Sequence, residues 1–268
     1  MSPERDRQRQ RVFDYHRRTK HYFERYAAGP QTIDWDAQPN PFRHFSGTHQ
    51  FKLPLAADTI TTTIQQLTTA HGISPAVFDL QHLGMLFELS FALSAWKQYG
   101  SARWSLRCNP SSGNLHPTEA YLLSAHKLAD LPAGVYHYRS DTHALEQRCR
   151  FDSSKTARDI SPGFYIGLTS IAWREAWKYG ERAFRYCQLD LGHAIAAASY
   201  AAACLGWRAT VVTNVTDAAI AGLLGLDRTA EFIEAEAETA EVLLSLAPHT
   251  AAPPETDFQN LLTLSLIH

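Results

Sequence analysis

Cysteine is scarce in this sequence, and its placement argues against two kinds of site. Four cysteines are spread along the chain without any Cys-x-x-Cys pair: Cys108, Cys149, Cys187 and Cys204. This spacing favours neither a zinc site nor a disulfide framework. The 13 histidines add no His-x-x-x-His pattern with a carboxylate, so no metal site is predicted.

A strong charge of either sign is also missing. The 25 Lys and Arg against 27 Asp and Glu give a formal net charge of -2, which differs from the basic footprint of a nucleic-acid binder or a polybasic membrane anchor. No apolar run reaches the roughly 18 residues that a bilayer span needs, and no signal-peptide core follows the charged N-terminus. We therefore expect a cytoplasmic protein with a small-molecule substrate and with no nucleic-acid or membrane partner.

What the chain does contain is enough apolar residues for a large core. It has 268 residues, of which 45% are hydrophobic and 11% aromatic. Neither a Gly-x-Gly-x-x-Gly after a first strand nor a Walker-type loop is present, which excludes the usual dinucleotide and P-loop folds. We expect an N-terminal helix and extended wrapping segment over residues 1–57, the main domain over 58–247, and a linker-like tail over 248–268.

The N-terminal part is rich in arginine and aromatic residues. Residues 1–26 are interpreted as an amphipathic surface helix whose aromatics pack on a neighbour, with a basic arm for a polyanion as the alternative. Residues 27–54 contain four prolines and favour an extended segment that wraps over the body. Within it, Arg43 either reaches inwards or is a solvated surface arginine.

Helical and strand patterns interleave through the main domain. A long core-facing helix is predicted from about residue 76 to 99, and an alanine-rich helix over 189–206 should pack closely against its neighbours. Strand patterns over 119–127 and 134–148 follow one another in hairpin order without a helix between them, which favours an α+β fold with a mixed or antiparallel sheet flanked by helices. The other predicted strands are 164–171, 208–215 and 240–247, and the other helices are about 58–71, 173–187 and 217–226.

The stretch from residue 107 to 123 looks like a ligand-binding loop mounted on a strand. Small residues allow a backbone to approach a ligand closely, and hydroxyls, an amide and free N–H groups offer many hydrogen bonds. For a flavin mononucleotide, arginines and a serine could take the phosphate and ribityl oxygens, and the loop could line the ring edge. The candidates are Arg103, Ser105, Arg107, Pro110, Ser111, Ser112, Gly113 and Asn114. An ordinary turn remains the alternative.

A second candidate cluster starts at Lys178-Tyr179. Spacings of three and four residues place Lys178, Arg182 and Arg185 along one helix face, which suits an anion, although Glu175 and Glu181 could neutralise it as a surface network. A lysine or tyrosine tuned by burial and neighbouring charges can act as a general base or acid.

Four motifs in this order resemble a known family. They are Arg107-Cys-Asn-Pro-Ser-Ser-Gly-Asn-Leu-His-Pro-Thr-Glu-Ala-Tyr, Gly134-Val-Tyr-His-Tyr, Lys178-Tyr-Gly-Glu-Arg-Ala-Phe-Arg-Tyr, and Leu191-Gly-His with Leu224-Gly-Leu. The series is similar to that of the nitroreductase-like FMN-dependent flavoproteins, and in particular of the SagB/ThcOx-type (azoline) dehydrogenase branch. Many relatives have tyrosine where this chain has His116, and asparagine where it has Ala197.

The resemblance implies a nitroreductase fold with FMN bound between two copies of the domain, in a homodimer or in a longer two-domain chain. It implies flavin contacts for Arg107 and for residues 111–114, and a proton-handling catalytic pair at Lys178 and Tyr179. The implied activity is hydride transfer between flavin and a small-molecule or peptide-derived heterocyclic substrate. The alternatives are an NAD(P)H-dependent nitro or quinone reductase and a non-catalytic flavin-binding or dimerisation module.

Overall fold

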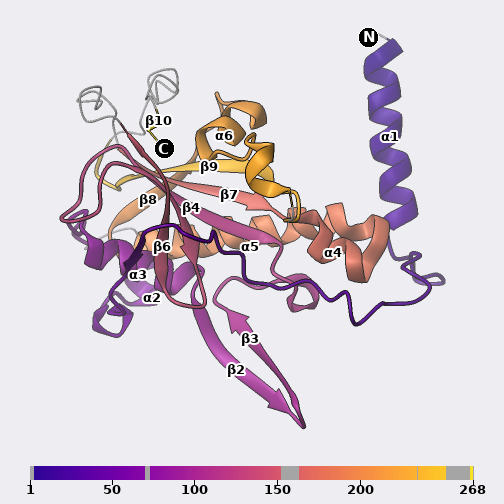
Figure 1. The fold of residues 1–268 in the computed structure, drawn as a ribbon, viewed down its shortest axis with the longest axis horizontal. Coiled ribbons are helices and arrows are strands. Elements are labelled where there is room, and N and C mark those ends of the chain that lie inside the picture. Colours follow the sequence, from indigo (N-terminus) through magenta and orange to yellow (C-terminus); the bar gives the residue numbers. More distant parts are fainter. Residues whose placement is uncertain (1–2, 70–72, 152–162, 234, 252–265, 268) are drawn as a thin grey trace.

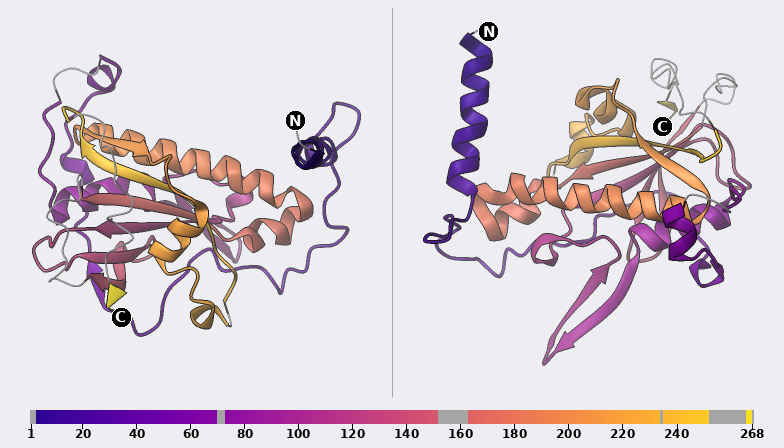
Figure 2. Two further views of the ribbon diagram at one scale, coloured as in Figure 1. Left: turned by 90° about the horizontal axis from the view of Figure 1, so that it is seen from above. Right: turned by 180° about the vertical axis from the view of Figure 1, so that it is seen from behind.

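The computed structural model describes residues 3–69, 73–151, 163–233, 235–251 and 266–267. A central sheet carries helices on both faces, while a helix at the N-terminus and a two-stranded hairpin stand away from this body (Figure 1). Two further views show the same arrangement from above and from behind (Figure 2). None of the described helices is long and apolar enough to cross a membrane.

The central sheet has eight strands among the described residues, and each pair is antiparallel. The strand order is β1-β6-β5-β4-β7-β9-β8, with β10 also pairing with β6. This confirms the predicted α+β class and its antiparallel sheet. The strands are β1 (Gln50–Lys52), β4 (Thr118–Ser124), β5 (Gly134–Arg139), β6 (Ala144–Phe151), β7 (Phe164–Ser170), β8 (Trp207–Val211), β9 (Thr239–Pro248) and β10 (Leu266–Ile267).

Two apolar clusters cover the two faces of this sheet. Side chains alternate along a strand, so on β4 Leu122 belongs to one cluster while Tyr121 and Leu123 belong to the other. Helices α3 (Leu80–Ser90) and α5 (Ala183–Cys204) bury the first face, and α6 (Asp217–Leu224) buries the second. The core therefore lies in two layers on either side of a sheet whose described central strands are buried.

The alanine-rich helix α5 packs as the sequence predicts. Ala194, Ala198, Ala201 and Ala202 are buried in the cluster that α5 shares with α3 and the sheet. Alanine side chains leave room for a close approach between a helix and its neighbours. These alanines hold the second half of α5 close against α3 and the sheet.

The helix predicted over residues 76–99 is wrong in its second half. Helix α3 begins only after Asp79, whose side chain caps it by accepting from the backbone N–H of His82 at 2.8 Å, and it ends at Ser90. The chain then forms β2 (Leu93–Tyr99), which pairs with β3 (Ala102–Arg107) across a two-residue turn. Local apolar spacing fits a helix here, but the backbone hydrogen bonds come from β3, and aromatic residues suit a strand.

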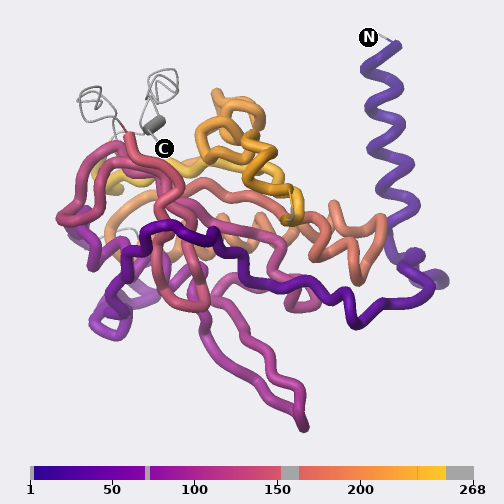
Figure 3. The backbone as a smooth tube through the Cα atoms, viewed as in Figure 1, coloured from indigo at the N-terminus to yellow at the C-terminus, as the bar shows by residue number. Residues whose placement is uncertain are grey.

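The N-terminal helix α1 (Pro3–Thr19) makes little contact with the body. Of its residues only Thr19 is buried, and Phe13 is half exposed, while Tyr15 packs edge-on against Phe184 of α5 at 5.7 Å between ring centroids. The predicted packing of its aromatics therefore holds for one side chain and not the other. After α1 an extended segment runs across the body to β1 (Figure 3).

Short helices complete the described chain. They are η1 (Ala57–Thr59), α2 (Ile64–Thr69), η2 (Ser112–Asn114), α4 (Ala172–Tyr179), η3 (Gly180–Arg182) and η4 (Thr229–Phe232). Of the tail predicted over 248–268, residues 252–265 and 268 lie outside the described part.

Candidate functional site

The loop between β3 and β4 is tied to the start of α5 by one carboxylate. Asp190 accepts from the Ser111 hydroxyl at 2.6 Å, from the Ser112 backbone N–H at 3.0 Å and from the Ser112 hydroxyl at 2.9 Å. Asp190 itself is buried. A carboxylate that accepts several hydrogen bonds fixes its partners more firmly than a neutral group would. The loop is therefore a rigid element rather than a free turn.

The next part of the loop has an unusual backbone conformation. Asn114 and His116 have positive φ angles of 61° and 51°. The Asn114 side chain donates to the Ser105 carbonyl at 2.9 Å, and its oxygen lies 2.9 Å from Nε2 of His116. Backbone strain of this kind persists only where the surroundings hold it in place, and it is concentrated at functional sites.

Gly113 brings the loop against the Lys-Tyr pair at the end of α4. With φ of 61°, an ideal Cβ at Gly113 would lie 2.5 Å from the Tyr179 hydroxyl and 3.2 Å from Nζ of Lys178. Any larger residue would displace both groups, so only glycine allows this approach. The two candidate clusters from the sequence thus meet at one point, with a cation and a hydroxyl over the loop backbone.

Arg174 fixes α4 relative to the same loop. Its Nη1 donates to the His116 carbonyl at 2.6 Å and to Oε1 of Glu119 on β4 at 2.5 Å. Both Arg174 and Glu119 are almost fully buried. Because the guanidinium bridges the loop, the strand and its own helix, the position of Lys178 and Tyr179 follows from a buried ion pair.

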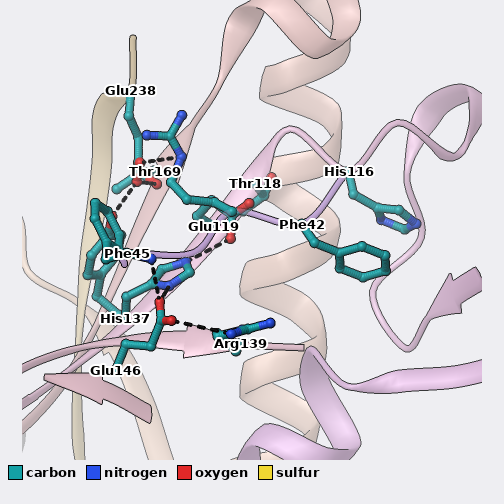
Figure 4. A network of polar contacts seen from close by, with 12 residues as sticks. Phe42, Phe45, His116, Thr118, Glu119, His137, Arg139, Glu146, Thr169 and Glu238 are labelled. Carbon is teal, nitrogen blue, oxygen red and sulfur yellow. Dashed lines mark hydrogen bonds and ion pairs between the residues drawn. The ribbon is translucent and has the colours of Figure 1, made fainter. Parts of the chain in front are cut away.

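This ion pair continues into a chain of buried charges beside the sheet. Figure 4 shows His137 between Glu119 and Glu146. The His137 ring nitrogens lie 3.0 Å from Glu119 and 3.1 Å from Glu146, and the Phe45 backbone N–H donates to Glu146 at 3.0 Å. Two carboxylates around one imidazole favour its protonated form, and although burial opposes this, the pKa of His137 is raised.

Arg43 belongs to the same buried region. It reaches inwards, where it pairs with Glu236 at 3.0 Å and with Glu238 at 3.5 Å. The interpretation as a solvated surface arginine is therefore wrong. Glu238 also accepts from Tyr121 at 2.8 Å and from Thr169 at 2.5 Å, so the extended segment is pinned to the sheet.

Burial and neighbouring charges set the protonation states around the loop. Burial, with Arg107 and Arg174 nearby, lowers the pKa of His116 to about 3, so its imidazole is neutral. Its Nδ1 is buried and has no hydrogen-bond partner among the described residues. Burial by itself would raise the pKa of Glu119, but Arg174, His137 and Arg107 outweigh it and lower the pKa to about 2.

Glu175 is a further buried acid one turn before the Lys-Tyr pair. Its side chain is fully buried, and neither carboxyl oxygen has a hydrogen-bond partner among the described residues. Burial, reinforced by the nearby Asp190, raises its pKa to about 9 even though Lys178 acts in the opposite direction. Glu175 is therefore protonated at neutral pH and does not neutralise Lys178 as a surface partner. Burial and Glu175 together raise the pKa of Tyr179.

The predicted site residues fall into two groups in space. Lys178 and Tyr179 meet the loop segment from Ser111 to Asn114, and Ser105 lies beneath it. Arg107 is turned away, because it donates to the carbonyls of Pro41 and Thr118 and lies over Phe42.

The remaining candidates lie further out. Pro110 is exposed, and Arg103 stacks on Trp96 near the tip of the projecting hairpin, 4.3 Å from the ring centroid. Arg182 contacts His21 at 2.7 Å and lies 5.4 Å from the centre of the Tyr179 ring. Among the described residues no group of three or more His, Cys, Asp or Glu side chains could hold a metal ion.

Sequence analysis missed three residues that organise the site: Asp190, Arg174 and Glu119. A signal existed for Asp190, since it is a charge inside a helix that is otherwise apolar on its packed side. Arg174 and Glu119 gave none, because they are 55 positions apart and each resembles a surface charge by itself.

Comparisons with known proteins agree with this fold. The nitroreductase family model matches residues 98–235, which include the loop and the Lys-Tyr pair. The trifolitoxin-processing protein TfxB of Rhizobium leguminosarum bv. trifolii is 30% identical over 141 residues, covering 48% of this chain and 38% of its own. This similarity supports the azoline-type branch expected from the motifs.

Solved structures show the same fold. A nitroreductase from Anabaena variabilis superposes with a TM-score of 0.69 and 26% identity, covering 91% of this chain and 48% of its own. A second, from Ralstonia eutropha, gives a TM-score of 0.53 at 15% identity over 80% of this chain and 100% of its own. A chain of the Escherichia coli microcin synthetase McbBCD complex superposes with a TM-score of 0.52 and 19% identity, covering 89% of this chain and 91% of its own.

The chain spans less than half the length of the trifolitoxin-processing protein and of the Anabaena nitroreductase. The family match nevertheless covers about half of the chain, and the solved structures superpose on its fold. The chain belongs to the nitroreductase family.

Proposed function

We propose that this chain forms part of an FMN-dependent oxidoreductase that transfers a hydride between flavin and a small-molecule or peptide-derived heterocyclic substrate. The observation that carries the proposal is the contact between Gly113 and the Lys178-Tyr179 pair. In that arrangement the backbone of Gly113, the ammonium group of Lys178 and the hydroxyl of Tyr179 lie close together. A flavin edge and a proton-transfer group are needed together at such a point.

The residues present fit a flavin at this loop. The backbone of Gly113 and the neutral His116, whose buried Nδ1 lacks a partner in the described chain, offer polar contacts, and Lys178 supplies positive charge. When bound, FMN supplies two-electron hydride chemistry. Asp190 holds the loop in place, and Arg174 holds α4 against it.

Tyr179 and Lys178 are assigned to the proton that accompanies hydride transfer. Burial raises the Tyr179 pKa, so its hydroxyl stays protonated at neutral pH and can donate a hydrogen bond. Lys178 is half-buried beside it, with Nζ 5.7 Å from the centre of the Tyr179 ring. We assign the proton of the substrate ring to this pair: the side-chain amine of Lys178 accepts it after giving up its own proton to solvent, while the protonated Tyr179 hydroxyl donates a hydrogen bond beside it.

Relatives support a substrate derived from a peptide. One is named for the processing of trifolitoxin, and the microcin synthetase complex was solved with truncated pro-MccB17 bound. Both names describe work on peptides. We extend this substrate class to the present chain as part of the proposal.

A second copy of the domain, or a further domain in a longer chain, is proposed to complete the flavin pocket. Within one chain Arg107 and the two serine hydroxyls are already engaged, by Pro41 and Thr118 and by Asp190. The same engagement favours one rival function, a non-catalytic flavin-binding or dimerisation module. In that case the loop would hold the fold together and serve no reaction.

A visible spectrum of the purified protein tests flavin binding, and turnover by the wild type and two variants separates an oxidoreductase from a non-catalytic flavin-binding module. We expect a yellow protein, or one that becomes yellow on reconstitution with FMN. Lys178→Ala and Tyr179→Phe should keep the flavin and lower substrate oxidation by about 10²–10⁴-fold, the usual contribution of acid–base groups. Unchanged turnover in both variants would reject the assigned pair, and a protein that never binds FMN would reject the oxidoreductase.

A further inference from the structure

A cavity that the proposed chemistry does not use is lined in part by Gly180, the residue that follows the Lys-Tyr pair. Its volume is about 630 Å³. It lies between the end of α1, the turn that follows α1 and the turn after α4. The lining residues are Arg17, Arg18, Thr19, Arg25, Ala28, Gly29, Pro30, Gly180 and Glu181. Three guanidinium groups thus face one space that has a single carboxylate.

That carboxylate is already occupied. Glu181 accepts from Nη2 of Arg18 at 2.5 Å and from Nε of the same guanidinium at 3.1 Å. In the described part of the chain the ion-pair partner of Arg17 is Asp14 at 3.8 Å, and Arg25 lies over the Tyr22 ring at 5.5 Å. Positive charge therefore exceeds negative charge around the cavity.

Two further arginines behind the wall add to this excess. Arg182 and Arg185 form no ion pair among the described residues, and each has a buried Nε without a hydrogen-bond partner there. They contact neutral or titratable groups instead: Arg182 lies 2.7 Å from His21, and Arg185 donates to Thr19 at 3.0 Å. A terminal nitrogen of Arg182 lies 3.3 Å from an ideal Cβ at Gly29, directly behind the cavity wall.

The charge of the N-terminal segment agrees with this local picture. Residues 3–26 contain eight Lys and Arg against four Asp and Glu, a net charge of +4, although the whole chain carries -2. Most of this segment is exposed. Arg17, Arg18 and Arg25 of this segment line the cavity where α1 meets the body, and positive charge there attracts an anionic ligand.

The cavity adjoins the reacting groups. Gly180 lines it and directly follows Tyr179, and an ideal Cβ at Gly180 would touch Pro30 at 3.4 Å. Arg182 lies 5.4 Å from the centre of the Tyr179 ring. A ligand bound here would therefore lie one residue away from the proposed proton-transfer pair.

We propose that this cavity binds carboxylate side chains of an acidic peptide segment of the substrate, next to the ring that reacts at Tyr179. This inference rests on the proposed function, because it names the substrate that the function uses. Separate arginines spread around a cavity of this size suit several spaced carboxylates, whereas a single phosphate needs donors that converge on one point.

Binding can be measured without any turnover. The purified full-length chain is titrated against fluorescently labelled hexaglutamate, with hexaglutamine as the uncharged control, and anisotropy is recorded. Hexaglutamate should bind, hexaglutamine should not, and the affinity should fall between about 50 mM and about 500 mM salt because exposed charges are screened.

A matched pair of double variants locates the site. Arg17→Gln with Arg25→Gln should weaken hexaglutamate binding about tenfold, as the loss of two exposed charge contacts predicts. Arg9→Gln with Arg11→Gln removes the same charge from the other part of α1 and also breaks one surface pair, Arg9–Asp6 at 3.3 Å, as the first variant breaks Arg17–Asp14. This second double variant should change the affinity for hexaglutamate by less than about twofold.

The outcomes separate this inference from the proposed function. Equal losses in both double variants would overturn the site, and so would binding of inorganic phosphate without binding of hexaglutamate. If the protein binds FMN and turns over but never binds hexaglutamate, only the peptide site is rejected. If hexaglutamate binds at the cavity while FMN does not bind, the oxidoreductase is rejected and the anion site stands.

Discussion

Asp190 and Ser112 are 78 positions apart in the chain, yet the Asp190 carboxylate accepts both the backbone N–H and the hydroxyl of Ser112, at 3.0 and 2.9 Å. The first residue lies on α5 and the second in the loop before β4. Because α5 is packed against the sheet, its Asp190 holds the loop in a fixed position relative to the core. The contact between Gly113 and Tyr179 depends on this anchor.

Replacing the anchor should destabilise the protein strongly. Asp190→Ala leaves the donors of Ser111 and Ser112 without their acceptor, and we expect a loss of about 3 kcal/mol in the free energy of unfolding. Urea unfolding of both proteins measures it. The exposed neighbour Gln188 on the same helix, which donates a hydrogen bond to Glu241 at 2.9 Å, serves as control: Gln188→Ala should cost under about 0.5 kcal/mol. Equal costs would contradict the anchoring role.

Gly113 should tolerate no side chain, for a reason that Gly100 does not share. Both glycines have positive φ, 61° and 58°, but a Cβ at Gly100 would meet no atom within 4 Å. Gly100→Ala therefore reports the backbone strain alone, about 1 kcal/mol. Gly113→Ala should cost roughly 2 kcal/mol more, since its Cβ overlaps the Tyr179 hydroxyl.

Adding Tyr179→Phe to Gly113→Ala removes the overlapping oxygen and leaves the nearest ring carbon at 3.2 Å. Part of the lost stability should return. If chemical denaturation finds the double variant no more stable than Gly113→Ala, the close approach of loop and ring is not what limits this position.

The buried pair between Arg174 and Glu119 should be costly to break. Arg174→Met removes the guanidinium that pairs with the buried Glu119 carboxylate. We expect the free energy of unfolding to fall by about 3–5 kcal/mol. The surface pair Arg9–Asp6 provides the comparison, where Arg9→Met should cost under about 1 kcal/mol. Thermal and urea unfolding check both values, and similar costs for the two variants would refute the bridging role of Arg174.

Glu175 should make the protein less stable as pH rises. Its folded pKa of about 9 lies far above the ordinary value for glutamate, so between these two values the folded state binds more protons than the unfolded state. Stability contributed by the neutral carboxyl is present at low pH and is lost as pH approaches 9. Glu175→Gln should flatten this slope and stabilise the protein at pH 7 by on the order of 2 kcal/mol.

The measurement is urea unfolding at a series of pH values. Glu181→Gln is the control, because the pKa of Glu181 is lowered by its hydrogen bond from Arg18, so its effect should appear only at the acid end. A wild-type profile that rises or stays level from pH 5 to 9 would show that Glu175 is ionised in the folded protein.

Local patterns were sufficient for much of the fold. The hairpin order of 119–148, the alanine spacing of 189–206 and the apolar strand at 164–171 each depend on neighbours in the chain, and each was predicted. The helix expected over 76–99 failed because its second half takes its hydrogen bonds from residues 102–107. The two-residue repeat of a strand and the 3.6-residue repeat of a helix cannot be told apart in a run as short as residues 93–99.

The sequence by itself determined the antiparallel α+β class and the two motif clusters, the loop at 111–114 and the pair at Lys178 and Tyr179. Only the tertiary structure decided that these clusters touch, that Asp190 and Arg174 hold them together, and that Arg43 is buried. These features depend on hydrogen bonds and ion pairs between residues that are 55 to 193 positions apart. A charged side chain looks the same in a sequence whether solvent or a buried partner surrounds it, because the packing that removes water comes from distant segments.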